Sequence, residues 1–232
     1  MTDHARSPAF AALDPQAVIE AVGPYVTERR RARIEAVVAA RLHGVEVAVE
    51  RPYDPHNAAA VVRSAEITGA GRVHVVEASE RILRARRTTT GAFHWVDTVQ
   101  HASLEDLVEV ARSRDMFLAG ACVDGDVDLE QLPVDGPICL MFGNEHAGLT
   151  AAAKAACDAR FSIAMHGFSE SFNLSVSAAI SLYSVTRRRR VALGRDGDLD
   201  APDQQALVAR YMAATVDDRL LEGLFPSLRE TS

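Results

Sequence analysis

The chain has 232 residues, which is enough for one large domain, or one domain with extensions, that buries its core without a disulfide or a structural metal. Its hydrophobic fraction of 48% and charged fraction of 25% are those of an ordinary globular protein. The sequence has no apolar run long enough to cross a bilayer, and its first ten residues lack the apolar core of a signal peptide, so we expect a cytoplasmic protein without a membrane anchor.

Cysteine usage and charge narrow the possible functions further. The three cysteines lack metal-ligand spacing, which predicts reduced thiols and no metal site. The formal net charge of −7 argues against nucleic-acid binding by bulk charge, yet arginines gather at 29–33, 81–87 and 187–190. Any one of these clusters could be a solvated helix face. Three of them in one acidic chain favour a local surface that binds a polyanion.

The N-terminal part of the chain has a helical pattern. Residues 1–15 show no periodicity and are expected to form a loose terminus. Between residues 15 and 43, apolar side chains recur at helical spacing on either side of Pro24, which predicts two short helices. The second helix opens on the arginine cluster 29–33.

A strand, a loop and a helix follow. Valines alternate with acidic residues over 45–50, which is a strand pattern, and the loop at 51–57 contains two prolines. Asn57 is a plausible N-cap for the next helix. Arg63 lies off the apolar stripe of that helix, so we expect its side chain to be outside the core.

The centre of the chain alternates between strand and helix patterns. Strands are expected at 73–76, 117–123, 138–143 and 161–165, and helices at 104–114, at 149–158 and from 172 onward. This alternation predicts an α/β fold with a mostly parallel sheet and helices on both faces. We expect three parts: an N-terminal helical extension (1–43), the α/β domain (44–190), and a linker with a C-terminal helical extension (191–232).

Polar residues follow three of the expected strands. Ligands of open parallel sheets bind outside the carboxyl ends of the strands, where Asn57 with Arg63, the segment 143–148 and the segment 167–173 would lie. The glycines of 143–148 allow a ligand to approach the backbone closely. Glu145 is expected to accept hydrogen bonds near the start of the following helix.

The helix expected from residue 172 combines an apolar stripe with a polar beginning. The stripe consists of Phe172, Val176, Ala179, Ile180 and Tyr183. We expect it to pack on the sheet or on a partner subunit, which leaves Asn173 facing the site.

Three other chemistries fit poorly. The glycines at 69 and 71 precede a strand rather than follow one, unlike a dinucleotide fingerprint. The segment 167–171 nearly matches a serine nucleophile elbow, but its second glycine is missing and no His/Asp partner stands out. Glu145 and His146 are adjacent and so lack metal-ligand spacing.

Three sequence blocks together resemble one known family. They are Asn57-x-x-Ala60-x-x-Arg63-Ser64, then Phe142-Gly143-Asn144-Glu145-His146-Ala147-Gly148-Leu149, then Ile163-Ala164-Met165-x-Gly167 followed by Glu170-Ser171-Phe172-Asn173-Leu174-Ser175. In this order they are similar to the SPOUT class of RNA methyltransferases, in its TrmH-like branch that methylates the ribose 2′-hydroxyl. The sequence departs from the family pattern at Ala164, where proline is common, and at Phe172, where leucine is common.

The resemblance implies a fold, a cofactor and an assembly. The family fold is an α/β sheet with a C-terminal deep trefoil knot, an exception to the rule against knots. Here Gly143–Leu149 and Ile163–Val176 would form the knot and hold S-adenosylmethionine. Family enzymes are homodimers whose active site forms at the subunit interface.

The resemblance also implies roles for individual residues. The cofactor would contact Ala121, Gly143, Ile163, Met165 and Leu174. Catalysis would rest on Arg63, with Asn57, Glu145, Ser171 and Asn173 at the remaining site positions. The family's arginine is regarded as a general base, but a guanidinium hardly deprotonates in proteins, so positioning of phosphate and hydroxyl would be its larger role.

The segments on either side of the knotted domain limit the choice of RNA substrate. Short helical extensions resemble the tRNA enzymes that methylate the D-loop guanosine 18, whereas an rRNA nucleotide and a non-catalytic RNA-binding module remain alternatives. The residues expected to bind RNA are Arg29, Arg30, Arg31, Arg33, Arg84, Arg86 and Arg87.

Overall fold

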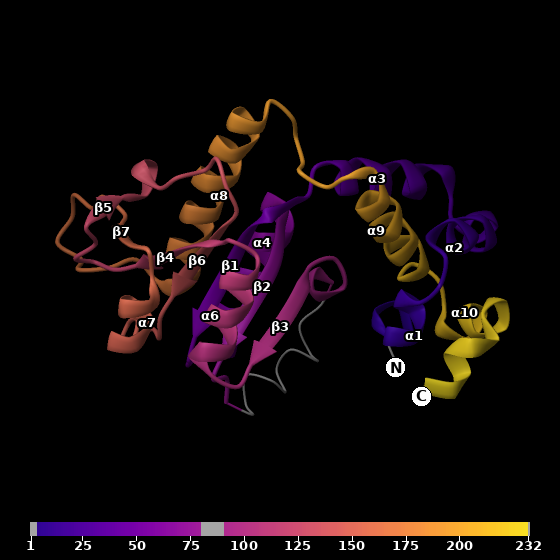
Figure 1. Cartoon of the computed structure of the whole chain (residues 1–232), viewed down its shortest axis with the longest axis horizontal. Coiled ribbons are helices and arrows are strands. Elements are labelled where there is room, and N and C mark those ends of the chain that lie inside the picture. The colour runs from indigo at the N-terminus through magenta and orange to yellow at the C-terminus, as the bar shows by residue number, and fades with distance from the viewer. Residues whose placement is uncertain (1–3, 80–90, 232) are drawn as a thin grey trace. The chain divides into compact units, whose positions relative to one another are not determined.

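The computed structural model describes residues 4–79 and 91–231 and divides the chain into two compact units. The first, here called the terminal unit, combines Met1–Arg41 with Leu199–Ser232. The second, the sheet unit, is Leu42–Asp198. Figure 1 traces the chain through both units.

The sheet unit is built on seven strands within the described residues, and every pairing between them is parallel. Their order across the sheet is β3-β2-β1-β6-β4-β7-β5. The strands are β1 Leu42–Glu50, β2 Ala70–Val76, β3 Asp97–His101, β4 Phe117–Ala121, β5 Val127–Asp128, β6 Ile138–Phe142 and β7 Ala159–Ser162. The helices are α4 Pro55–Thr68, α6 Leu104–Ser113, α7 Ala151–Ala156 and α8 Leu174–Leu193, with the 3₁₀ turns Ala92–His94 and Leu129–Gln131.

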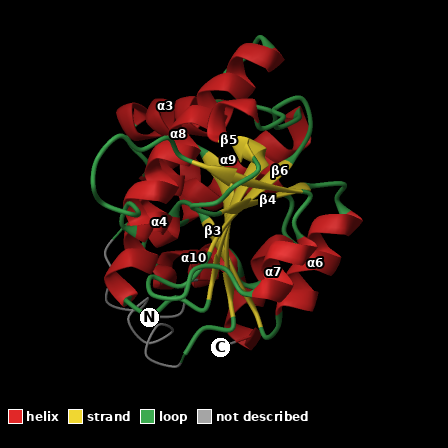
Figure 2. Cartoon of the chain, turned by 90° about the vertical axis from the view of Figure 1, so that its left-hand side faces the viewer, coloured by secondary structure: helices red, strands yellow, loops and turns green. Residues whose placement is uncertain are grey.

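Helices cover both faces of the sheet, as Figure 2 shows with α4 and α8 on one side of the strands and α6 and α7 on the other. One buried cluster consists of side chains from α4 and α8 together with the valines of β1 and β2 that face these helices. The other joins α6 and α7 to Ala48, Val76, Cys139 and Met141. The predicted α/β fold with a mostly parallel sheet is therefore confirmed.

Several local predictions were wrong. Strand β3 lies in a segment to which we assigned no strand, because its sequence, Asp97–His101, is polar and sits at the edge of the sheet. Strand β7 ends at Ser162, so the segment 163–165 is not strand. Helix α4 is capped by Asp54, with Pro55 at its first position, and Asn57 therefore lies inside the helix rather than at its N-cap.

The apolar stripe of α8 does not pack on the sheet. The side of α8 that packs into the core carries Leu174, Ala178, Leu182 and Val185. The predicted stripe faces outward, with exposed fractions of 41% for Phe172, 44% for Val176, 36% for Ile180 and 67% for Tyr183. Helix α8 is thus apolar on two sides, and the sheet covers only one of them.

The arginine cluster at 187–190 is mostly structural. The guanidinium of Arg188 donates to the carbonyl oxygens of Leu129, Glu130 and Leu132. Arg189 donates to the carbonyl of Val134, and Arg190 donates to those of Thr68 and Asp196. These three arginines bind backbone of the sheet unit, so the expectation that this cluster adds to a polyanion surface was wrong for them.

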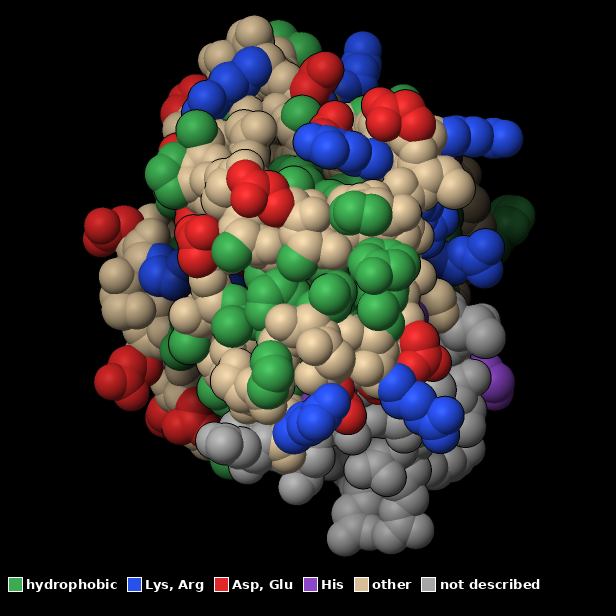
Figure 3. Space-filling model, turned by 90° about the vertical axis from the view of Figure 1, so that its right-hand side faces the viewer, with side chains coloured by type: hydrophobic (Ala, Val, Ile, Leu, Met, Phe, Trp, Pro, Cys, Tyr) green, Lys and Arg blue, Asp and Glu red, His purple; other side chains and the backbone are tan. Residues whose placement is uncertain are grey.

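The terminal unit is helical. Its elements are η1 His4–Arg6, α1 Pro8–Ala11, α2 Pro15–Val22, η2 Gly23–Tyr25, α3 Glu28–Ala39, α9 Ala201–Ala213, α10 Asp218–Leu224 and η6 Pro226–Thr231. Helix α9 packs on α2 and α3, and the buried His4 meets Glu222 at 2.9 Å. Residues 4–15 are therefore not the loose terminus that we expected. On the face drawn in Figure 3, hydrophobic side chains gather in the middle, and basic and acidic side chains alternate around them.

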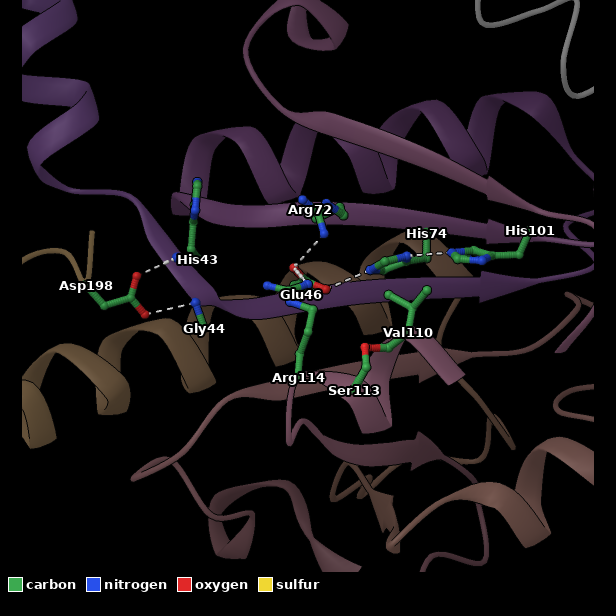
Figure 4. Close-up of polar contacts among 10 residues, drawn as sticks. All are labelled: His43, Gly44, Glu46, Arg72, His74, His101, Val110, Ser113, Arg114 and Asp198. Carbon is green, nitrogen blue, oxygen red and sulfur yellow. Dashed lines mark hydrogen bonds and ion pairs between the residues drawn. The ribbon is translucent and has the colours of Figure 1, made fainter. Parts of the chain in front are cut away.

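A buried polar network crosses three strands of the sheet unit (Figure 4). His74 on β2 joins Glu46 on β1 at 2.7 Å and His101 on β3 at 2.8 Å. Glu46 also accepts a hydrogen bond from Arg114 at 2.6 Å and lies 3.7 Å from Arg72. A single proton suffices for the contact between the two imidazoles, so protonation of both rings would set two donors against each other.

The pKa values in this network make stability depend on pH. Burial lowers the pKa of His101, and the charge of His74 lowers it further. Burial alone would raise the pKa of Glu46, but hydrogen bonding and charge from His74, with help from Arg114 and Arg72, hold it below its ordinary value. For both groups the unfolded chain binds more protons than the folded chain in acid. Stability is therefore lost as the pH falls below the ordinary histidine value of 6.5, and further below the ordinary glutamate value of 4.5.

We expect His101→Gln to flatten the loss of stability between about pH 7 and pH 5. The measurement is the free energy of unfolding from urea titrations across that range. His56→Gln is the matched control because it removes an exposed histidine, and it should keep the wild-type slope. Equal slopes in the wild type and His101→Gln would contradict the assignment to His101.

Candidate functional site

A cavity of about 350 Å³ opens at the carboxyl ends of β4, β6 and β7. It is lined by residues from four segments, 121–124, 142–149, 161–165 and 171–177, and by Lys154. Its apolar lining includes Ala121, Phe142, Leu149, Phe161, Ile163, Met165, Phe172 and Leu174. Its charged lining residues are Asp124, Glu145 and Lys154, with His146 beside them, and Lys154 is the only lysine of the chain.

The loop after β6 is tightly closed by its own backbone. Asn144 and Gly148 exchange two backbone hydrogen bonds, of 3.1 and 2.8 Å, and the Asn144 side chain accepts from the N–H groups of His146 and Ala147. Gly148 has a φ of +67°, the left-handed region that favours glycine. A Cβ at Gly143 would lie 2.0 Å from the backbone of Gly148, so only glycine fits there.

Glu145 connects this loop to the beginning of α4. Its carboxylate accepts hydrogen bonds from the backbone N–H of Tyr53 and of Asp54, and from the side chain of Asn57 at 3.0 Å. Burial alone would raise the pKa of Glu145, but these hydrogen bonds outweigh it and lower the pKa below its ordinary value. We expected Glu145 at the start of the following helix, whereas it serves the start of α4.

Asn57 links the same cluster to α8. The Asn173 side chain donates to Asn57 Oδ1 at 3.2 Å. Asn173 is also the N-cap of α8, and its Oδ1 accepts from the backbone N–H and the hydroxyl of Ser175. Asn173 is exposed and lies outside the core. The chain Glu145–Asn57–Asn173 therefore ties the three sequence blocks together.

The structure brings most of the predicted site residues to one place. The five expected cofactor contacts, Ala121, Gly143, Ile163, Met165 and Leu174, all line the cavity, as do Glu145 and Ser171. Asn57 and Asn173 do not line it but join it through Glu145. Arg63 does not line it either. Arg63 lies six residues beyond Asn57 on α4, about 9 Å further along the helix axis, and its exposed side chain has no ion-pair or hydrogen-bond partner among the described residues.

The expected RNA-binding arginines fall into two groups. Arg29, Arg30, Arg31 and Arg33 are all exposed on α3 of the terminal unit, and Arg31 pairs with Glu35 at 2.9 Å. Arg84, Arg86 and Arg87 lie outside the described residues.

Sequence reasoning missed two residues beside the cavity. Glu50, at the end of β1, is buried and accepts two hydrogen bonds from Thr150, directly after the loop. The sequence did contain a signal for Glu50, because an acidic residue is unusual in a strand that is buried on both faces. Cys122 lines the cavity, and burial raises the pKa of its thiol.

Residues 4–79 and 91–231 contain neither a candidate metal site nor a candidate membrane span. No group of three or more His, Cys, Asp or Glu side chains is arranged to hold a metal ion. No helix there is both long enough and apolar enough to cross a membrane.

Comparison with known proteins points to one family. The sequence model of the SpoU rRNA methylase family matches residues 44–183. The chain is 32% identical over 183 residues to the tRNA (guanosine(18)-2′-O)-methyltransferase of Escherichia coli (strain K12), an alignment that covers 77% of this chain and 80% of that protein. The SpoU methyltransferase AviRb from Streptomyces viridochromogenes, in complex with AdoMet, aligns with a TM-score of 0.60 at 28% identity, over 66% of this chain and 64% of that chain. The A. aeolicus TrmH/SpoU tRNA modifying enzyme aligns with a TM-score of 0.61 over 88% of this chain and 97% of that chain, at 20% identity, which shows the fold alone.

Proposed function

Because the chain belongs to the SpoU rRNA methylase family, we propose that it uses S-adenosylmethionine to methylate the ribose 2′-hydroxyl of guanosine 18 in tRNA. The supporting observation is that the three sequence blocks converge on one cavity and are joined by the Glu145–Asn57–Asn173 hydrogen bonds. The choice of tRNA is supported by the name of the Escherichia coli relative, of which the chain covers 80%.

The cavity fits S-adenosylmethionine. Its volume of about 350 Å³ lies in the range of small-molecule sites, and apolar side chains line it beside the exposed backbone of the 143–148 loop. Ala121, Gly143, Ile163, Met165 and Leu174 would hold the cofactor. When bound, its sulfonium supplies an electrophilic methyl group.

The chain's own polar groups would position the ribose 2′-hydroxyl for methyl transfer. The 2′-hydroxyl must be directed at the cavity, and its proton must pass to an acceptor, an RNA phosphate oxygen or water, during transfer. Arg63, which is exposed and unpaired in the described part of the chain, would hold an RNA phosphate together with this hydroxyl through its planar fork of donors. Ser171 at the cavity and the Glu145–Asn57–Asn173 chain would orient the RNA backbone beside it.

The same proposal includes a knotted chain and a division of labour. The 143–149 and 163–176 segments line one cavity although β7 separates them, which supports a trefoil knot. Residues 44–190 would catalyse. RNA would be held by Arg29, Arg30, Arg31 and Arg33 on α3 of the extension 1–43, and by Arg84, Arg86 and Arg87 within residues 44–190. The protein would act in the cytoplasm, where its three free thiols stay reduced.

A homodimer is also part of the proposal. Phe172, the first residue of the outward stripe, precedes α8 and also lines the cavity, so a partner that covers the stripe would reach the cavity rim. Arg63 lies on α4, which packs beside α8, and it stands away from the cavity of its own chain. A second copy would thus bury the exposed stripe and complete the site.

We expect the double variant Val176→Asp/Ile180→Asp to be monomeric and to lose methyl transfer, because two charges cannot be buried unpaired in an apolar interface. Light scattering coupled to gel filtration gives the mass. The exchange variant Val176→Ile/Ile180→Val keeps the apolar surface and should remain dimeric. A dimeric, active Asp variant would exclude this interface.

The proposed function is tested by methyl transfer to two purified substrates, an unmodified tRNA transcript and unmodified rRNA, with the product nucleoside mapped by mass spectrometry. We expect 2′-O-methylguanosine at position 18 of the tRNA. A transcript with deoxyguanosine at that position should accept no methyl group.

A second candidate substrate is rRNA, which is favoured by the family's own description. Methylation of rRNA alone, or of another tRNA nucleotide, would contradict guanosine 18 and leave the RNA methyltransferase assignment standing. A non-catalytic RNA-binding role does not agree with relatives that are named as methyltransferases.

A further inference from the structure

Glu50 is a buried acidic residue next to the cavity, with a side chain that is 2% exposed. It is the last residue of β1, and its carboxylate contacts Thr150, the residue that follows the cavity loop. Glu50 Oε2 accepts the backbone N–H of Thr150 at 2.9 Å, and Oε1 accepts the Thr150 hydroxyl at 2.6 Å. Both oxygens are thus used on one residue.

Thr150 also connects Glu50 to the beginning of α7. Its hydroxyl oxygen accepts the backbone N–H of Ala153 at 3.1 Å as the N-cap of α7, while its hydrogen goes to Glu50. Leu149, the preceding residue, lines the cavity. Glu50 therefore holds the point at which the cavity loop becomes a helix.

The other end of the loop is fixed to the segment directly after Glu50. The Asn144 side chain donates to the carbonyl of Arg51 at 2.8 Å, and Glu145 binds the N–H groups of Tyr53 and Asp54. Arg51 has a φ of +50°, an uncommon value for a residue with a side chain. The end of β1 thus contacts the loop at both of its ends.

We propose that Glu50 is a positioning residue that holds the 143–150 loop in the conformation that binds the adenosyl cofactor. The inference rests on the proposed function. It adds a residue that touches neither the cavity nor the RNA. A loop without this anchor samples other conformations, and the apparent affinity falls by the fraction that remains competent.

Glu50→Gln keeps the shape of the side chain but disrupts the two hydrogen bonds that the carboxylate accepts from Thr150. The amide oxygen can accept the Thr150 N–H, but the amide N–H₂ then meets the Thr150 hydroxyl, which must turn its hydrogen away while its oxygen already accepts from Ala153. Both hydrogen bonds also lose the negative charge of their acceptor. We expect S-adenosylhomocysteine, measured by isothermal titration, to bind about tenfold more weakly or worse, the typical loss for a buried hydrogen bond to a charged group. We also expect amide hydrogen exchange of residues 144–150 in the ligand-free protein to become faster.

The chain offers a matched control on the same strand. Glu46 is four residues earlier on β1, faces the same side of the sheet and is 1% exposed, and it binds His74 and Arg114 (Figure 4). It does not line the cavity and lies about 13 Å back along the strand from Glu50. Glu46→Gln should lower thermal stability and leave ligand affinity within about twofold. The pair Thr150→Val and Thr150→Ser tests the other partner. The valine variant should bind weakly, and the serine variant should bind like the wild type.

The outcomes separate the two proposals. Wild-type protein that fails to bind S-adenosylhomocysteine would overturn the proposed function and this inference together. Binding by the wild type and equally by Glu50→Gln, or an equal loss in Glu46→Gln, would overturn the role of Glu50 alone. If Glu50→Gln does not fold, the Thr150→Val and Thr150→Ser comparison decides.

Discussion

Arg63→Ala is expected to reduce methyl transfer about tenfold or more and to leave the affinity for S-adenosylhomocysteine within about threefold. The reason is the placement of Arg63. Its side chain is exposed on α4, outside the cavity, and has no partner in the described residues whose loss would disturb the fold. Its loss should therefore affect the RNA and not the cofactor. Single-turnover rates with tRNA, beside titration of the cofactor product, give the two quantities.

Two other arginine variants sharpen this test. Arg63→Lys keeps the charge but not the planar fork of donors, so it should recover only part of the rate. Arg195→Ala removes an exposed arginine elsewhere in the sheet unit and should react like the wild type. Activity of Arg63→Ala above a tenth of wild type would remove Arg63 from the proposed role.

The architecture could be predicted because alternation of strands and helices constrains it strongly. Parallel strands need crossover helices on the faces of the sheet, so the polar segments after three strands had to lie at one edge. That reasoning placed Gly143, Glu145 and Asn173 near one another without a structure. It missed β3, because periodicity reports burial, and an edge strand such as Asp97–His101 is buried little.

Side-chain partners could not be predicted in the same way. The partners of Glu145 come from residues 53–57, about ninety positions earlier in the chain, and sequence spacing contains no information about such contacts. The stripe of α8 shows a related limit. Periodicity identified the apolar positions of the stripe, but in the structure Leu174 and Ala178, on the other side of the helix, pack on the sheet. Which of two apolar sides faces the core is decided by packing.

The arginines of α3 lead to the remaining prediction, which concerns how an acidic protein holds RNA. Arg29, Arg30, Arg31 and Arg33 are exposed, and Arg31 is partly neutralised by Glu35. Each phosphate contact releases counterions, so the logarithm of affinity falls with the logarithm of salt concentration by about 0.7–0.9 per contact. About four contacts would weaken RNA binding roughly a hundredfold between about 50 and 200 mM salt.

We expect Arg29→Ala/Arg30→Ala/Arg31→Ala to reduce this slope by about two and to raise the apparent KM for tRNA. The affinity for S-adenosylhomocysteine should stay the same, because the cavity is lined from the sheet unit alone. The control is Arg195→Ala/Arg219→Ala, which removes two exposed arginines outside α3 and should keep the wild-type slope. Filter binding of tRNA at several salt concentrations measures how the logarithm of affinity changes with the logarithm of salt concentration. If the triple variant binds RNA with the wild-type affinity and slope, the α3 cluster is a solvated helix face, and RNA must be held by other groups.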